Sequence, residues 1–190
     1  NLENGKIWYG TDGTWFNDAS GNTGNPSTDA YPHQTISATH LAQKPFLVTG
    51  SVEGNGATCF GENSVADGDR TSAFGVNASA KGLGATAFGS NSTAGARATA
   101  LGAFANANGE NAIAIGGLSN ATGVSSLAIG EEAQALGDRS FAFGFQSNAS
   151  KNDTLALGTG AIANFSSSAA LGQNVETTRS GQVALGSSGA

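Results

Sequence analysis

Few residues in this chain of 190 have the types and spacing that catalysis requires. The histidines are His33 and His40, and no motif around them brings a serine or a carboxylate into a catalytic arrangement. Cys59 is the single cysteine, and it occupies a place that other repeats fill with alanine. We therefore expect Cys59 to be a buried small residue, not a nucleophile. With no phosphate-binding or calcium-binding motif either, we expect no enzyme and no catalytic, metal or cofactor-binding residue.

Composition and charge exclude further classes of protein. The formal net charge is −6 and only 12% of the residues are charged, which excludes a basic nucleic-acid surface. No apolar run approaches the length of a membrane span, so we expect no direct membrane insertion of this segment. Aromatic residues make up 7%, and much of the apolar fraction is alanine. A single copy would bury little apolar area, which favours self-association.

A short phrase recurs from residue 58 onward. It reads TCFG at 58–61, SAFG at 72–75, IAIG at 113–116 and VALG at 183–186. Ten such phrases end in glycine, at intervals of 14 residues except for one interval of 13. A second phrase, with alanine five residues after the glycine, lies inside eight of the nine periods. Repeats in such register predict a solenoid over residues 58–190.

Each 14-residue unit holds two short stretches of alternating residues, separated by glycine. Alternation over four or five residues is typical of strands, and 14 residues suit two strands and two tight turns. One unit would be one coil of a flattened β-roll, with each strand pairing in parallel with its copies above and below. The sequence therefore predicts an all-β parallel solenoid about 40–45 Å long.

The first strand of each unit alternates bulky and small residues. The residues one and three before the glycine, such as Ile115 and Ile113, carry the bulk, and we expect them to fill the roll. The residue between them is alanine, where a solvated strand would be polar. We predict that this alanine column is an interface in a symmetric homo-oligomer with a closed axis. The predicted interface residues are Ala73, Ala87, Ala100, Ala114, Ala128, Ala142, Ala156, Ala170 and Ala184.

The reiterated phrases carry a family resemblance. The stretches NAIAIGGLSNATG at 111–123 and DRSFAFGFQSNAS at 138–150 closely resemble the YadA-like head of trimeric autotransporter adhesins. The resemblance covers about residues 58–186. It implies a left-handed parallel β-roll, a homotrimer about a long axis, and a place on the bacterial cell surface beyond the outer membrane. We expect the stalk and membrane anchor of such proteins to lie outside this segment.

The resemblance also implies partners and functions. We expect a cell-adhesion head that attaches to extracellular matrix proteins (the collagen, fibronectin and laminin class), to host cells or to abiotic surfaces. Autoagglutination, biofilm formation and virulence belong to the same expectation. The alternative is a structural spacer that projects a binding tip. An ice-binding solenoid is disfavoured because a short run of threonines, Thr58, Thr86 and Thr99, ends at Ile113.

Two groups of residues are candidate ligand contacts. The first lies in the non-repeating segment 1–57, where KIWYG and GTWFND predict a small hairpin. This segment can serve as a cap over the open end of the roll, as a ligand-binding tip, or as both. The second group is the polar outward position of the second strand. The candidate contacts are Trp8, Tyr9, Trp15 and Phe16 in the hairpin, and Asn106, Asn120, Gln134 and Asn148 on the roll.

Overall fold

The computed structural model describes residues 8–9, 15–16 and 50–186. The chain divides into two compact units, Asn1–Leu47 and Val48–Ala190. In the first unit, β1 (Trp8–Tyr9) pairs antiparallel with β2 (Trp15–Phe16), with Trp8 opposite Phe16. The predicted pairing of these two stretches is confirmed.

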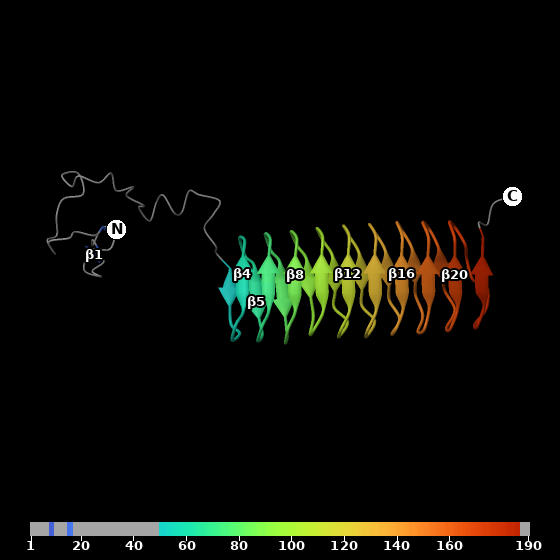
Figure 1. Ribbon diagram of the computed structural model, residues 1–190, viewed down its shortest axis with the longest axis horizontal. Coiled ribbons are helices and arrows are strands. Elements are labelled where there is room, and N and C mark those ends of the chain that lie inside the picture. Colours follow the sequence, from blue (N-terminus) through green and yellow to red (C-terminus); the bar gives the residue numbers. More distant parts are fainter. Residues whose placement is uncertain (1–7, 10–14, 17–49, 187–190) are drawn as a thin grey trace. The chain divides into compact units, whose positions relative to one another are not determined.

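The second unit is a roll of stacked coils made of two parallel sheets (Figure 1). Consecutive strands along this unit alternate between the sheets, except that the last two strands both belong to the larger sheet. The ten-stranded sheet consists of β4 (Thr58–Phe60), β6 (Ser72–Phe74), β8 (Thr86–Phe88), β10 (Thr99–Leu101), β12 (Ile113–Ile115), β14 (Leu127–Ile129), β16 (Phe141–Phe143), β18 (Leu155–Leu157), β20 (Ala169–Leu171) and β21 (Val183–Leu185). The nine-stranded sheet consists of β3 (Ser51–Val52), β5 (Val65–Asp67), β7 (Ser79–Lys81), β9 (Thr93–Ala94), β11 (Asn106–Ala107), β13 (Asn120–Ala121), β15 (Gln134–Ala135), β17 (Asn148–Ala149) and β19 (Ile162–Ala163).

The register of both sheets follows the sequence period. Ala100 of β10 lies opposite Ala87 of β8 on one side and Ala114 of β12 on the other. The parallel solenoid of 14-residue coils is thus confirmed. Because β3 already pairs with β5, the first coil includes Ser51–Val52, and the expected boundary after residue 57 falls within that coil.

Two tight turns close each coil. We call the turn that leaves the ten-stranded sheet the first corner and the turn that leaves the nine-stranded sheet the second corner. In one coil, the Ala78 amide donates to the Gly75 carbonyl (3.2 Å) at the first corner, and the Ala85 amide donates to the Gly82 carbonyl (3.3 Å) at the second. The third residue of such a turn has positive φ, as at Asn77 (φ 55°), which suits asparagine and glycine.

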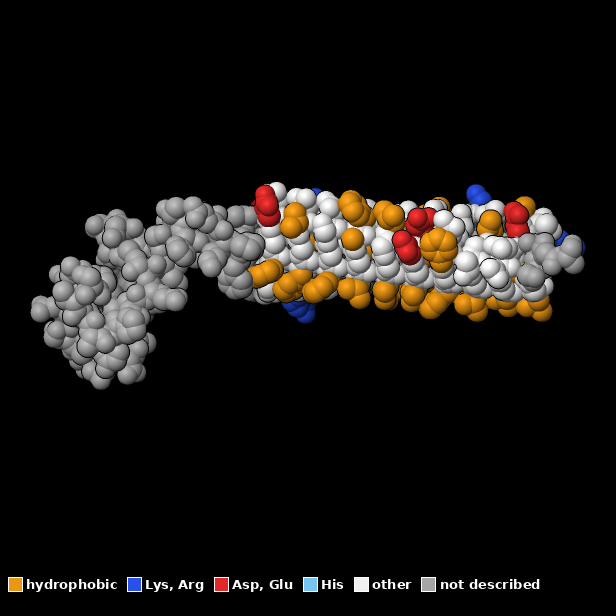
Figure 2. Space-filling model, turned by 90° about the horizontal axis from the view of Figure 1, so that it is seen from above, with side chains coloured by type: hydrophobic (Ala, Val, Ile, Leu, Met, Phe, Trp, Pro, Cys, Tyr) orange, Lys and Arg blue, Asp and Glu red, His pale blue; other side chains and the backbone are white. Residues whose placement is uncertain are grey.

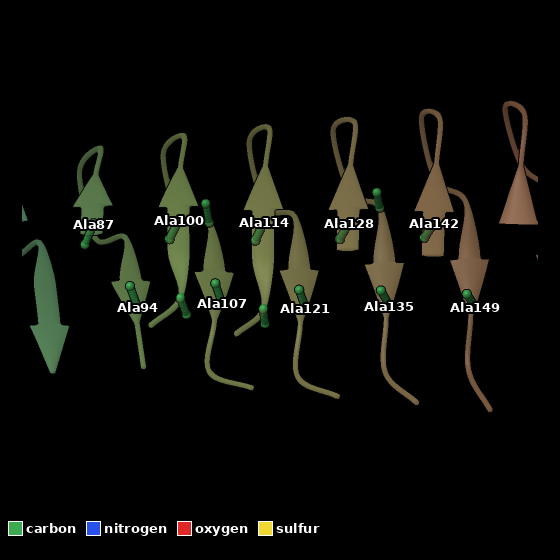
Figure 3. Packing of buried hydrophobic residues seen from close by; sticks show 14 of the residues in the cluster. Ala87, Ala94, Ala100, Ala107, Ala114, Ala121, Ala128, Ala135, Ala142 and Ala149 are labelled. Carbon is green, nitrogen blue, oxygen red and sulfur yellow. The ribbon is translucent and has the colours of Figure 1, made fainter. Parts of the chain in front are cut away.

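The core of the roll is built from small side chains alone over most of its length. Each coil points four residues inward, one from each strand and one from each corner, and nearly all are alanine, serine or threonine. Figure 3 shows the alanines of the two sheets, such as Ala114 and Ala121, along the interior. With so little volume between them, the sheets must lie closer than the usual ~10 Å. A phenylalanine or leucine would not fit inside.

This core reverses the predicted orientation of the first strand. The alanine column lies inside its own coil, and the bulky residues on either side point outward. Ala184 is half-buried, and the other alanines expected at the interface are fully buried within a single chain, leaving no side-chain surface for another copy: Ala73, Ala87, Ala100, Ala114, Ala128, Ala142, Ala156 and Ala170. The prediction that this column forms the interface is therefore wrong.

Candidate binding surface

An apolar face covers the outer side of the ten-stranded sheet. We give this name to the outward residues at the first and third positions of the ten strands. In all ten strands the third position is phenylalanine, isoleucine or leucine. Leu101 is 44% exposed, Leu157 46% and Leu185 74%. Figure 2 shows a row of hydrophobic side chains along one edge of the roll. Soluble monomers rarely expose a continuous apolar surface of this length, which marks an interaction site.

The first positions of the apolar face change character along the roll. In the first four strands they are Thr58, Ser72, Thr86 and Thr99. From β12 onward they are Ile113, Leu127, Phe141, Leu155, Ala169 and Val183. The C-terminal part of the face is therefore apolar at both positions, whereas the N-terminal part alternates hydroxyl and apolar groups.

The candidate contacts on the roll form a polar column on the opposite sheet. Asn106, Asn120, Gln134 and Asn148 lie in register on neighbouring strands β11, β13, β15 and β17. The Nδ2 of Asn106 donates to Oδ1 of Asn120 (3.1 Å), which ties two coils together. The Oδ1 atoms of Asn106 and Asn148 are buried and have no hydrogen-bond partner. The structure thus brings these four amides together in one row.

Positively charged side chains of the described coils lie at or beside one of the two corners. All six cations of the described part of the chain lie in the second corners or, for Lys81, at the end of the strand that leads into one: Arg70, Lys81, Arg97, Arg139, Lys151 and Arg179. Two of these arginines make ion pairs between neighbouring coils. Arg97 pairs with Glu110, and Nε of Arg139 lies 2.7 Å from Oδ1 of Asp153. The Arg139 guanidinium, chiefly through its hydrogen bond, lowers the pKa of the Asp153 carboxyl below its ordinary value.

The first corners carry no cation in the described coils, and their charged side chains are Glu62, Glu131 and Glu132. They also expose large apolar groups: Phe104 is 56% exposed and Leu118 53%. Figure 2 shows hydrophobic side chains beside acidic ones on the face that it presents. Sequence reasoning did not select these residues, although their place in the turns, where every other described coil has asparagine, glycine, glutamate or glutamine, would have marked Phe104 and Leu118 as exceptional.

The hairpin contacts can be placed only by their strands. Trp8 and Tyr9 lie on β1, and Trp15 and Phe16 lie on β2. Their side chains, and the segments of 1–49 around these strands, lie outside the described residues, so their role in capping or binding stays a prediction.

The apolar face itself was also missed by sequence reasoning, and a signal for it was present. The second strand and the corners point only small side chains, mostly alanine and serine, inward, so the two sheets lie close together and no space remains between them for Phe or Leu. Counting the small residues over the whole coil, and not strand by strand, would have assigned the bulky residues to the outside.

Comparisons with known proteins agree with this architecture. The YadA head domain repeat family matches residues 53–78, 66–92, 94–119, 121–147 and 149–174. The crystal structure of the collagen-binding domain of the Yersinia adhesin YadA is similar, with a TM-score of 0.53 and 27% sequence identity over 68% of each chain. No curated protein sequence matches the chain.

The roll and its repeats thus define a domain of the adhesin-head class. More particularly, the chain belongs to the family of YadA head domain repeats.

Groups typical of other functions are lacking in the described ranges. Residues 8–9, 15–16 and 50–186 hold no cluster of three metal-ligating side chains. In those same residues no helix is long and apolar enough to cross a membrane.

Proposed function

We propose that the chain is an adhesive head on a bacterial cell surface, which three copies form by packing their apolar faces together about a common axis. The observation that carries the assembly is the exposed apolar face, ten strands long, that a single chain leaves uncovered. A closed symmetric assembly would cover the face of every copy equally and leave no open apolar edge. The number three comes from the resemblance to trimeric adhesin heads.

The proposed ligands are extracellular matrix proteins, with collagen first, because the similar Yersinia domain is described as collagen-binding. Once the apolar faces are covered, the polar column of Asn106, Asn120, Gln134 and Asn148 remains as an outward surface on each copy. Amide side chains in register can exchange hydrogen bonds with an extended polypeptide backbone. Repetition over three chains would give avidity from weak contacts.

Light scattering after size exclusion tests the assembly. A trimer gives about 56 kDa, three times the chain mass of 18.7 kDa. Immobilised collagen, fibronectin, laminin and bare surfaces then test adhesion with the same sample. A stable monomer contradicts the assembly, and a trimer that binds none of these surfaces contradicts the adhesive role.

The second candidate function is that of a spacer, which the repetitive core favours because every coil is built alike. Deleting one whole coil, residues 113–126, distinguishes the two functions. A spacer keeps the binding of the parent chain unchanged, whereas an adhesive roll loses part of its contacts with the loss of Asn120.

A further inference from the structure

In two neighbouring coils, the third residue of the first corner is a large apolar residue, which is unusual for a turn. This position has positive φ and is filled by asparagine, glycine, glutamate or glutamine except at Phe104 (φ 58°) and Leu118 (φ 57°). Large side chains are disfavoured in this region of φ, and here they also lie more than half exposed to water. Neither local backbone preference nor the core of the roll accounts for them.

The two residues are stacked in space. The Phe104 amide donates to the Ser90 carbonyl (2.9 Å), and the Leu118 amide donates to the Ala103 carbonyl (3.0 Å), so consecutive corners follow the coil spacing. The residues before them in their turns, Ala103 and Gly117, are small and leave both side chains open on that side. Phe104 and Leu118 therefore form one exposed apolar pair on neighbouring coils, which are spaced about 5 Å apart along the roll.

In the next two coils, charged side chains and a second aromatic ring continue the surface formed by Phe104 and Leu118. Glu131 and Glu132 occupy the following first corner, and Glu132 accepts a hydrogen bond from Nε2 of Gln146 (2.9 Å). One coil further, Phe145 is 44% exposed. We call Phe104, Leu118, Glu131, Glu132 and Phe145 the corner patch. It covers three coil intervals, roughly 14 Å.

The charge around the corner patch selects its occupant. All the cations of the described coils lie at or beside the second corners, so no lysine or arginine in the first corners neutralises Glu131 and Glu132. A cationic group next to exposed phenylalanine rings would gain both ionic and cation–π attraction. An extended chain rises about 3.3 Å per residue, so four to six residues span the patch.

We propose that the corner patch binds an extended, basic segment of a partner protein in which every second residue faces the patch and these facing residues are apolar, cationic and apolar in turn. The apolar residues contact Phe104, Leu118 and Phe145, and the cation faces Glu131 and Glu132. The site is separate from the apolar face and from the polar column, and it goes beyond the matrix-binding function proposed above.

Three synthetic peptides of about six residues test the proposal on the full chain. One has leucine, arginine and leucine at alternate positions with glycine between them, one has glycine in place of both leucines, and one has glutamate in place of the arginine. Fluorescence anisotropy should give an affinity for the Arg/Leu peptide at least tenfold higher than for the other two, since it alone matches both charge and apolar contacts. Equal affinity for the Arg/Gly peptide, or no binding of the Arg/Leu peptide, overturns the proposal.

The decisive variant is Phe104→Asn with Leu118→Asn, which installs the residue that Asn91 supplies at the same place. Since asparagine suits positive φ, the variant should fold, and its affinity for the Arg/Leu peptide should fall at least tenfold. The control is Val124→Asn, which removes an apolar group, 46% exposed, from a second corner and should leave the affinity unchanged. Equal losses in the two variants overturn the proposal.

Light scattering separates this proposal from the assembly proposed above. The Asn pair should keep the mass of the parent chain. A lower mass assigns Phe104 and Leu118 to the contact between copies and overturns the peptide site, while supporting self-association. Loss of collagen binding alone leaves the peptide result standing.

Discussion

Buried hydroxyl groups differ from coil to coil in whether they are satisfied. Ser147 donates its hydroxyl to the Gly144 carbonyl (2.9 Å), and Ser64, Ser92 and Ser119 make the same bond to the glycine of their own turns. The hydroxyls of Ser126 and Ser140 are buried without a partner. An unsatisfied hydroxyl in a core costs free energy that alanine would not.

Two serine-to-alanine substitutions should therefore differ in their effect on stability. Ser147→Ala loses a hydrogen bond and should lower the free energy of unfolding by about 1 kcal/mol. Ser140→Ala removes an unsatisfied group of equal burial and should leave stability unchanged or raise it. Chemical denaturation followed by circular dichroism measures both. A larger loss for Ser140→Ala would contradict the hydrogen-bond assignment.

The Arg139–Asp153 pair predicts a pH effect with a defined sign. Because the pKa of Asp153 is lowered in the folded chain, its contribution is present above the ordinary value of 3.8 and is lost as pH falls through the lowered pKa. Both groups are exposed, so the effect on stability is small. In Arg139→Gln, NMR titration should show the Asp153 pKa rising toward 3.8. An unchanged pKa would mean that the arginine does not act on this carboxylate.

At the scale of the coil, one glycine fixes how closely neighbouring coils stack. Gly116 has φ 126°, and an added Cβ would lie 2.5 Å from the Gly130 carbonyl oxygen in the next coil. The following residue, Gly117, has no atom closer than 3.9 Å to such a Cβ. A side chain therefore has no space at Gly116, whereas one fits at Gly117.

Gly116→Ala should lower the free energy of unfolding by at least about 2 kcal/mol, since it combines an unfavourable φ with a clash against backbone. Gly117→Ala serves as the control and should be tolerated. Thermal unfolding of the two variants checks this difference. If both unfold at the same temperature, the stacking of the coils is not set by this glycine.

The sequence period predicted the elements well but misassigned their faces. Strands such as β12 and β13, their parallel pairing and their turns follow from alternation and glycine spacing, which are local signals. Whether Ile113 or Ala114 points inward depends on the thickness of the whole roll, which is a property of two sheets at once. The row formed by Asn106 and Asn120 was predictable from the period, whereas the exposed Phe104 required the turn geometry.

For the whole molecule, the apolar face predicts how self-association responds to substitution. Leu157→Asp should reduce the mass from about 56 kDa to the single-chain 18.7 kDa, because an assembly would bury one unpaired carboxylate per copy. The control is Thr93→Asp on the nine-stranded sheet, which should keep the mass of the parent. Light scattering measures the mass, and circular dichroism confirms that the roll remains folded. A trimer that survives Leu157→Asp would remove the apolar face as its interface.

The core of small side chains bears on how the length of such a head can evolve. Every coil except the last buries nearly the same four small residues, so a coil inserted between two others meets neighbours like its own. A duplication of fourteen codons would lengthen the roll by about 4.8 Å without repacking any interior side chain. The coil containing Gly95, one residue short, shows that a single codon can be lost at a solvent-facing corner while the ladders on both sides stay in register. Recombination between repeats can therefore lengthen or shorten the head by one coil at a time.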